Sequence, residues 1–321
     1  QILSLPLPLI VVGSAGSGKT ALMLEKMKAL TGQGLYVTLS KFLVENSRRI
    51  YYSNGFDSEA QELDFLSFKE FIQSIQIPQG KELHFKQFLS WWNRIKGSSS
   101  LKDPHKLFEE FRGVLTGSSI HTAYLSREEY LQLGIKQSIF LENERPLVYD
   151  VFQKYLQFLK SESYFDLNIV SHQNEKLISP KYDFVVVDEI QDLTNIQIHL
   201  ILKSLKSTGN TSGQWFLCGD SNQIVHPNFF SWASVKTMFY NSSGQNPTEI
   251  LRVLNNNFRN SQNVTELSNK ILVLKNKRFG SIDKESNFLV KSQSQYPGHI
   301  LRLTTEANVL KTVNDKTAKS T

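Results

Sequence analysis

Cysteine and long hydrophobic runs are almost absent from this chain of 321 residues. Its one cysteine, Cys218, excludes an internal disulfide and argues against a zinc site. The apolar neighbours of Cys218 predict a small buried core residue. No stretch approaches the ~20 apolar residues that a membrane span needs, so we expect no membrane partner. These absences favour a reducing, intracellular compartment, cytoplasmic or nuclear.

Charge of either sign is only mildly in excess. The chain has 36 Lys and Arg against 30 Asp and Glu, a formal net charge of +6. This balance fits a polyanionic partner or an ordinary solvated basic surface, and composition does not choose between them. The length suggests about two domains. The first residue is Gln rather than Met, which indicates a piece of a longer polypeptide.

What the chain does contain is an apolar run that ends in a glycine-rich loop. Residues 11–20 read V-V-G-S-A-G-S-G-K-T, and a helical pattern follows. This G-x-x-x-x-G-K-T spacing between a strand and a helix is typical of a phosphate-binding loop. All fixed positions are filled, which disfavours a chance glycine-rich turn. We predict that the loop binds a nucleoside triphosphate through Gly13, Ser14, Ala15, Gly16, Ser17, Gly18, Lys19 and Thr20.

The chemistry of this loop explains its residue types. Glycines let successive backbone N–H groups turn toward one point, and the next helix adds its positive N-terminal end. Lys19 supplies a positive charge for the β- and γ-phosphates, and Thr20 supplies a hydroxyl ligand for Mg²⁺.

A second apolar run ends in two acidic residues. Residues 184–187 are apolar, and Asp188 and Glu189 follow them directly. Asp188 can hold the Mg²⁺ that bridges the phosphates, and Glu189 is placed to polarise the attacking water as a general base. The alternative is an acidic cap of the next helix. The phosphate-binding loop in the same chain favours the magnesium ligand and the base.

Two further segments are weak signals when taken alone. Residues 219–223 read G-D-S-N-Q, and the amide of Gln223 could sense the γ-phosphate. Residues 257–260 read N-F-R-N, so Arg259 could reach the transferring phosphate and Phe258 could stack on the base. The ordinary alternatives are a turn for the first segment and a polar loop for the second.

In this order the four motifs resemble those of the UvrD/Rep-like superfamily-1 helicases. Residues 188–192, D-E-I-Q-D, match the family's D-E-x-Q-D box, and residues 219–223 match its G-D-x-x-Q motif. Residues 257–260 are close to its N-Y-R-S motif. The resemblance runs from the first strand to about residue 275. It implies ATP and Mg²⁺ as cofactors, with binding and hydrolysis carried by Lys19, Thr20, Asp188, Glu189, Gln223 and Arg259.

The resemblance also assigns secondary roles. Phe258 takes the adenine-stacking place, and Gln191 joins a nucleotide-sensing network between two RecA-like domains. Residues 38–41 occupy the place of the family's first loop that contacts single-stranded DNA.

The strand and helix patterns fit the family's α/β fold, a P-loop RecA-like parallel sheet with a mostly helical inserted subdomain and the start of a second RecA-like domain. Short apolar runs predict strands at residues 5–12, 35–39, 182–187 and 214–218. Helical spacing without a clear strand covers residues 63–75, 83–95, 106–115 and 147–159.

We therefore divide the chain into three parts. Residues 1–58 and 176–248 form the RecA-like ATP-binding domain, and residues 59–175 form the helical insertion. Residues 249–321 begin a second RecA-like domain, with strands predicted at 249–253 and 299–303.

The chain departs from the family pattern after Gln223. The family usually continues I-Y-x-F-R-G-A, and those aromatics contact single-stranded DNA. Here residues 224–233 read I-V-H-P-N-F-F-S-W-A, which is two residues longer and has Ser231 in place of the arginine. Aromatics for base stacking are kept, but the nucleic-acid path is altered or lost. This variant is similar to the UvrD-like modules inside some very large repeat-containing proteins.

The insertion offers a second pair of aromatics for stacking, Trp91 and Trp92. Their helical spacing with Phe85 and Phe88 favours core packing instead.

Two functions stay open. The first is an ATP-driven helicase or translocase motor that acts on single-stranded DNA or RNA, with the later helicase motifs on the remainder of a longer polypeptide. The second is an ATPase switch or scaffold module of a larger defence, signalling or effector protein, without unwinding. A small-molecule kinase is disfavoured because D-E-x-Q-D and N-F-R-N have no role in one. We expect the chain alone to hydrolyse ATP poorly or not at all.

Overall fold

The computed structural model describes residues 2–135, 137–206, 213–224, 230, 232, 235, 250–280 and 287–300. Its centre is a six-stranded sheet in which each pair of neighbours runs parallel. The order is β3-β2-β6-β7-β1-β8. The strands are β1 (Leu9–Gly13), β2 (Gly32–Thr38), β3 (Gln61–Ser67), β6 (Phe184–Val187), β7 (Gln214–Gly219) and β8 (Leu251–Leu254).

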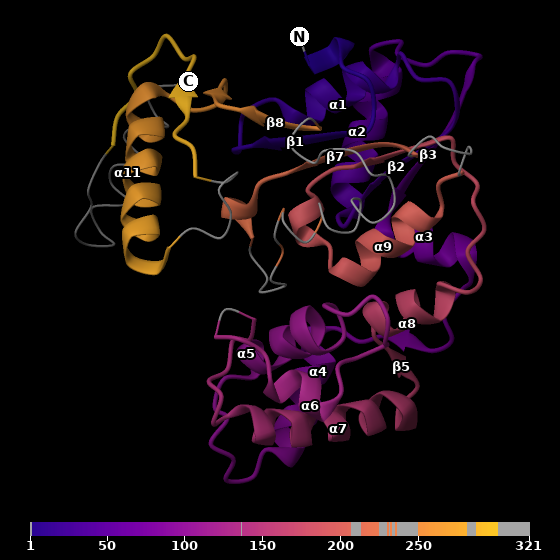
Figure 1. The fold of residues 1–321 in the computed structure, drawn as a ribbon, viewed down its shortest axis with the longest axis vertical. Coiled ribbons are helices and arrows are strands. Elements are labelled where there is room, and N and C mark those ends of the chain that lie inside the picture. The colour runs from indigo at the N-terminus through magenta and orange to yellow at the C-terminus, as the bar shows by residue number, and fades with distance from the viewer. Residues whose placement is uncertain are drawn as a thin grey trace, which may run out of the picture.

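Both faces of this sheet are covered, which explains its continuous apolar strands. In β1 the side chains of Leu9 and Val11 join one hydrophobic core, and those of Ile10 and Val12 join the other. This alternation follows from the two-residue period of a strand. Helices α1 (Lys19–Met27) and α2 (Lys41–Ser53) cover the first face, and α3 (Phe68–Ile75) and α9 (Asn195–Lys203) cover the second (Figure 1).

A separate, mostly helical unit lies between α3 and α8 in the chain and has a core of its own (Figure 1). Its elements are β4 (Lys81–Glu82), α4 (Phe85–Ile95), α5 (Pro104–Glu109), the π-helix η2 (Glu110–Leu115), α6 (Arg127–Leu131), α7 (Arg145–Ser161) and β5 (Tyr164–Phe165). The chain returns to the sheet through α8 (Leu167–Asn174), whose Val170 packs into the core shared with α3 and α9.

Aromatic side chains fill the core of this insertion. Trp91 and Trp92 are 5% and 2% exposed, and the Trp91 ring stacks on Phe158 at 5.1 Å between centroids. Such rings contribute a large buried apolar area. The prediction that this tryptophan pair serves core packing is confirmed.

The predicted helix over residues 63–75 is wrong in its first half. Residues 61–67 form β3, which pairs with β2 at the sheet edge, and the helix begins only at Phe68. Ser67 caps α3 in a reciprocal capping box with Glu70, which fixes this start. The misleading signal was the three-residue spacing of Phe65 and Phe68, because it joined a strand residue to a helix residue.

The strand predicted at residues 249–253 lies at 251–254 and belongs to the first sheet, where β8 pairs with β1. A separate two-stranded sheet follows, made of β9 (Asn256–Asn257) and β10 (Lys291–Ser292), beside helix α11 (Gln262–Phe279). No strand occurs at residues 299 and 300, and the rest of that predicted strand lies outside the described residues.

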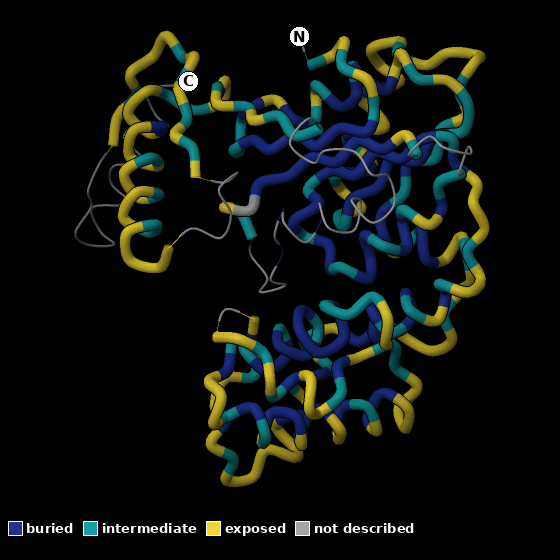
Figure 2. Tube along the Cα trace, viewed as in Figure 1, coloured by how far each residue is buried: buried dark blue, intermediate teal, exposed yellow. Residues whose placement is uncertain are grey.

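We now propose a division in which residues 61–75 and 251–254 go with the first sheet. The insertion then starts after α3 and ends before α8. Buried residues concentrate in the sheet and on the inner faces of the insertion helices, whereas α11 is largely exposed, with only Thr265 buried (Figure 2). Among the described residues, none of the helices combines the length and apolarity that a membrane crossing requires.

Candidate nucleotide-binding site

The glycine-rich loop connects β1 to α1 at the carboxyl end of the central sheet. Gly16 and Gly18 have φ of +81° and +85°, a left-handed conformation that side-chain-bearing residues rarely adopt. Gly18 is the N-cap of α1, so the first backbone N–H groups of that helix face the loop. The sequence prediction of a strand, a glycine turn and a helix N-terminus is confirmed here.

Lys19 is buried inside the loop that it belongs to. The residue is only 6% exposed. Its Nζ donates to the carbonyl oxygen of Gly13 at 2.8 Å and to that of Ser14 at 3.4 Å. The hydroxyl of Ser17 is buried and has no hydrogen-bond partner among the described residues. A buried cation and an unsatisfied hydroxyl beside left-handed glycines fit the oxygens of a phosphate chain.

Thr20 and Asp188 meet across the loop although 168 positions separate them in sequence. The Thr20 hydroxyl donates to Oδ2 of Asp188 at 2.8 Å, and the Tyr36 hydroxyl donates to the same oxygen at 3.1 Å. The other carboxylate oxygen, Oδ1, accepts the backbone N–H of Glu189 at 2.9 Å. The structure therefore brings together the predicted magnesium ligands.

Burial is the largest influence on the pKa of Asp188. Asp188 is 2% exposed, and burial, followed by the nearby charge of Glu189, raises its pKa above the ordinary value. The hydrogen bond from Thr20 and the charge of Lys19 oppose that rise. Burial also raises the pKa of the Tyr36 hydroxyl, so that this group keeps its proton.

The donor set fits Mg²⁺. One carboxylate and one hydroxyl are hard oxygen ligands, and Mg²⁺ is usually held by one or two such groups with water and phosphate oxygens completing the shell. Within the described part of the chain, no cluster of three or more His, Cys, Asp or Glu could hold a metal by protein groups alone. Thr20 and Asp188 would hold the ion, whose positive charge would stabilise the phosphates.

Glu189, the second residue after β6, has an unusual backbone conformation. Its φ is +48°, in the left-handed region where a residue other than Gly is uncommon. Its Oε2 accepts a hydrogen bond from Nε2 of Gln191 at 2.8 Å, while Oε1 of Gln191 accepts the backbone N–H of Asp220 at 2.9 Å. Gln191 thus connects the predicted base to the next motif along the sheet.

Gln223 lies on a short 3₁₀ turn, η4 (Ser221–Gln223), after β7. Its amide Nε2 donates to Oδ2 of Asp220 at 2.6 Å. The adjacent Asn222 accepts a hydrogen bond from Lys275 of α11 at 2.9 Å. This motif therefore contacts both the strand ends of the first sheet and the helix that follows the fourth motif.

The fourth motif docks directly on the glycine-rich loop. Nδ2 of Asn257 donates to the carbonyl oxygen of Ala15 at 2.8 Å, and the backbone N–H of Phe258 donates to that of Gly16 at 2.8 Å. A Cβ atom at Gly16 would lie 2.6 Å from Cβ of Arg259, so only glycine allows this approach. Arg259 is exposed, and Phe258 is 66% exposed beside the loop.

Two segments were predicted to contact nucleic acid, the stretch after Gln223 and the loop after β2. Phe230 and Trp232 are 2% and 0% exposed and pack edge to face at 5.0 Å in the core beneath the sheet, so the expectation that these two rings are available for stacking is wrong. Residues 225–229, 231, 233 and 234 of that stretch lie outside the described residues. In the loop after β2, Ser40 caps α2 and the exposed Lys41 pairs with Glu70 at 3.5 Å.

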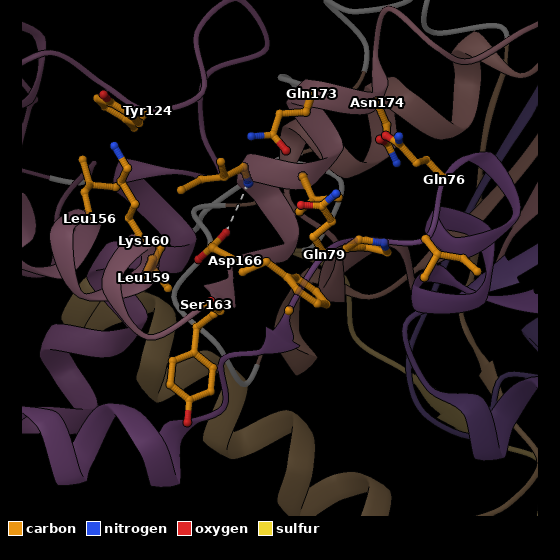
Figure 3. Close-up of a pocket in the computed structure, with 17 residues that line it drawn as sticks. Gln76, Gln79, Tyr124, Leu156, Leu159, Lys160, Ser163, Asp166, Gln173 and Asn174 are labelled. Atoms are coloured by element: carbon orange, nitrogen blue, oxygen red, sulfur yellow. Dashed lines mark hydrogen bonds between the residues drawn. The ribbon is translucent and has the colours of Figure 1, made fainter.

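A cavity of about 860 Å³ lies at the junction of the insertion and the sheet. Figure 3 shows that amide side chains gather on one side of it, Gln76, Gln79, Gln173 and Asn174, with Lys160 and Tyr124 on the other. Asp166 at its floor is satisfied by internal hydrogen bonds, among them those from Tyr155 and Thr116. None of the four motifs contributes to this cavity.

Sequence reasoning missed Tyr36 and Asn257 as parts of the site. Tyr36 is the one aromatic residue in β2, and a hydroxyl on a buried strand requires a partner. That requirement was the available signal. Asn257 carries the contact with Ala15, and only the folded chain shows it.

Sequence comparisons relate this chain to known proteins. The sequence model of the UvrD/REP helicase N-terminal domain matches residues 2–243. A probable DNA helicase II homolog of Mycoplasma capricolum is 25% identical over 307 residues, which are 87% of this chain and 40% of that protein. The human TPR and ankyrin repeat-containing protein 1 is 26% identical over 163 residues, 47% of this chain and 5% of that protein. The chain thus spans less than half the length of either relative.

Proposed function

The chain belongs to the UvrD/REP helicase family, and from this premise we propose that it is the ATP-binding part of a motor that moves along single-stranded nucleic acid. The proposal extends to ATP with Mg²⁺, to hydrolysis, and to a remaining part of the motor on the same longer polypeptide. The sequence motifs, the site geometry and the 87% coverage of this chain by a probable DNA helicase II homolog support it.

One observation carries the proposal. Two segments far from the glycine-rich loop in sequence contact it directly, where Thr20 bonds to Asp188 and Asn257 bonds to Ala15, and a third reaches the site through the bond of Asp220 with Gln191. A nucleotide at this loop would be contacted from several of these segments at once. An arrangement of this kind can couple the state of the phosphates to the position of the segment that follows residue 257.

In this proposal each residue has a separate task. Lys19 and the backbone N–H groups of the loop bind the phosphates, and Thr20 with Asp188 holds Mg²⁺. Glu189 takes the proton of the attacking water, and its bond with Gln191 orients the carboxylate. Gln223 reports the state of the γ-phosphate to Asp220.

Two exposed side chains complete the proposed site. Arg259, beside Gly16, stabilises the charge that develops on the transferred phosphate, as an arginine finger does. Phe258, two-thirds exposed, stacks on the adenine base.

For the nucleic-acid path, we propose the cleft where the insertion faces the loop after β2 and the first turns of α3. Its volume is about 470 Å³, and Lys41, Lys69 and Arg112 line it. Lysine and arginine side chains bind phosphates of nucleic acids through charge, independently of sequence. Glu70 and Glu82 line it as well and pair with the lysines, so binding there exchanges existing ion pairs for phosphate contacts.

A second function is favoured by the burial of Phe230 and Trp232. If the stretch after Gln223 offers no exposed ring, the module acts as an ATPase switch or scaffold within a larger protein. The match to a small portion of a TPR and ankyrin repeat-containing protein is consistent with such a setting.

ATP turnover with and without single-stranded DNA or RNA tests the motor against the switch. It is measured on the chain and on a longer polypeptide that carries it. The motor predicts stimulated turnover and binding that weakens steeply as salt rises. Turnover that ignores nucleic acid, with no salt-sensitive binding, contradicts the motor and favours the switch. Absence of ATP binding in both proteins contradicts both functions.

A further inference from the structure

Tyr36 lies in the middle of β2 and is fully buried. Its ring belongs to the core beneath α1 and α2, whereas its neighbours Leu35 and Val37 face the opposite core. Its hydroxyl contacts two polar side chains, Oδ2 of Asp188 at 3.1 Å and Oγ of Ser47 on α2 at 2.9 Å. A phenol therefore sits between the proposed magnesium ligand and a helix.

The direction of these two hydrogen bonds follows from the donors available. An ionised carboxylate can only accept, so the single Tyr36 proton goes to Asp188. Ser47 then donates its own proton to the Tyr36 oxygen. The result is a directed chain from Ser47 through Tyr36 to Oδ2 of Asp188, and this oxygen also accepts from Thr20.

Elsewhere in the same core a comparable tyrosine has no such contact. Tyr51 on α2 is also 0% exposed, and its hydroxyl donates to Oε1 of Gln61 at 2.8 Å. Both phenols satisfy the need of a buried hydroxyl for a partner. Of these two hydroxyl groups, that of Tyr36 alone donates to a side chain of the proposed nucleotide site.

We propose that Tyr36 is a positioning residue that sets the orientation of the Asp188 carboxylate for Mg²⁺-nucleotide, with Ser47 holding the Tyr36 hydroxyl in place. The inference rests on the proposed ATP site. The backbone N–H of Glu189 holds Oδ1, and without Tyr36 the Oδ2 atom would keep Thr20 as its one side-chain donor. A second donor on Oδ2 restricts the tilt of the carboxylate further and stabilises its buried negative charge.

The test is Tyr36→Phe, which removes the hydroxyl and keeps the ring. Binding of a fluorescent ATP analogue to the full chain is titrated in Mg²⁺ and again in EDTA. We expect affinity in Mg²⁺ to fall about tenfold, because a hydrogen bond to a charged group is lost. Affinity in EDTA stays within about twofold of the wild type, because phosphate binding by Lys19 and the loop does not depend on Tyr36.

Two further variants separate positioning from stability. Tyr51→Phe removes a buried phenol hydroxyl from the same core. It should lower the stability of the chain as Tyr36→Phe does, but leave nucleotide affinity in Mg²⁺ at the wild-type value. Ser47→Ala leaves Tyr36 in place and should lower affinity in Mg²⁺ in the same direction by a smaller factor. Paramagnetic resonance of Mn²⁺ in the presence of nucleotide gives a second readout that does not depend on turnover.

The outcomes are distinct. Equal loss of affinity in Mg²⁺ and in EDTA, or equal behaviour of Tyr36→Phe and Tyr51→Phe, overturns the positioning role while the ATP site stands. If Tyr36→Phe does not fold, an unchanged Mg²⁺ dependence in Ser47→Ala overturns it. A wild-type chain that binds no nucleotide under either condition refutes the proposed function, and the inference with it.

Discussion

The helical insertion and the sheet each bury a carboxylate at the centre of a hydrogen-bonded cluster, Glu110 and Asp188, and the two acids differ in what surrounds them. Glu110 in the insertion is 0% exposed, and its oxygens accept from the hydroxyl of Tyr130 at 2.7 Å, from the Ser138 hydroxyl and from the backbone N–H of Ile139 at 2.9 Å. Asp188 at the sheet is equally buried but stands beside Lys19 and Thr20 at the strand ends.

For both acids burial is the largest cause of a raised pKa. The partners of Glu110 come from α6 and from the loop before α7, so its hydrogen bonds hold parts of one core together. The partners of Asp188 are the hydroxyl groups of Thr20 and Tyr36 and the backbone N–H of Glu189, so its hydrogen bonds join the glycine-rich loop to β2 and to the end of β6. Burial of an acid therefore does not by itself identify a site, and the identity of its donors does.

The largest expected effect is on ATP turnover, from a substitution of Glu189 beside the buried Asp188. Glu189→Gln should lower ATP turnover about a thousandfold, since a positioned base contributes roughly 10²–10⁴. Nucleotide affinity should stay near that of the wild type. Turnover is to be measured in a longer polypeptide that carries the chain, and wild-type rates there would remove Glu189 as the base.

A second effect concerns the cation of the loop. Lys19→Ala should weaken binding of an ATP analogue by about a hundredfold, because a buried charge that contacts the phosphates is lost. Lys26→Ala is the matched control: this lysine is also 6% exposed and lies on the same helix, but it bonds to the carbonyls of Leu3 and Leu5. Unchanged affinity in Lys19→Ala would refute the nucleotide site.

The structural acid gives a third effect. Glu110→Ala should lower the free energy of unfolding by about 2 kcal/mol, because buried donors of Tyr130, Ser138 and Ile139 lose their acceptor. Urea denaturation of the chain measures it, with Glu128→Ala on the exposed face of α6 as the control. Intact stability, or a loss of nucleotide affinity while the fold is kept, would contradict the assigned division of labour.

The smallest effect is a dependence on pH. Because the pKa of Glu110 is raised in the folded state, the folded chain binds this proton more tightly than the unfolded chain. Its contribution to stability is full below the ordinary value of 4.5 and falls as pH rises from there through the folded pKa. Glu110→Gln should flatten that part of the stability profile. A slope identical to the wild type would show that other groups cause it.

The residues of the proposed nucleotide site could be named from the sequence because each motif is a local pattern. The first three motifs lie at the ends of β1, β6 and β7, and parallel strands deliver their carboxyl ends to one edge, so the contact of Thr20 with Asp188 could be expected. The partners of Tyr36 lie 11 and 152 residues away, and no local pattern encodes them.

The fold was less predictable at the two sheet edges. Strand β3 carries Leu63 and Phe65 on one face, but Phe65 also has helical spacing with the residues of α3. Strand β8 was recognised as a strand, yet its place in the first sheet depends on its pairing with β1. Pairing across a sheet is set by tertiary packing, and a short apolar run carries no information about its partner.

A single residue, Asn255, separates β8 in the first sheet from β9 in the second. The chain has no slack there, since one residue spans only about 3.5 Å. A rotation of the second sheet against the first would therefore have to change the backbone torsions around Asn255. Because Asn257 and Phe258 are bonded to Ala15 and Gly16, the same rotation pulls on the loop. The one-residue connection and these two bonds therefore tie the position of the second sheet to that of the glycine-rich loop.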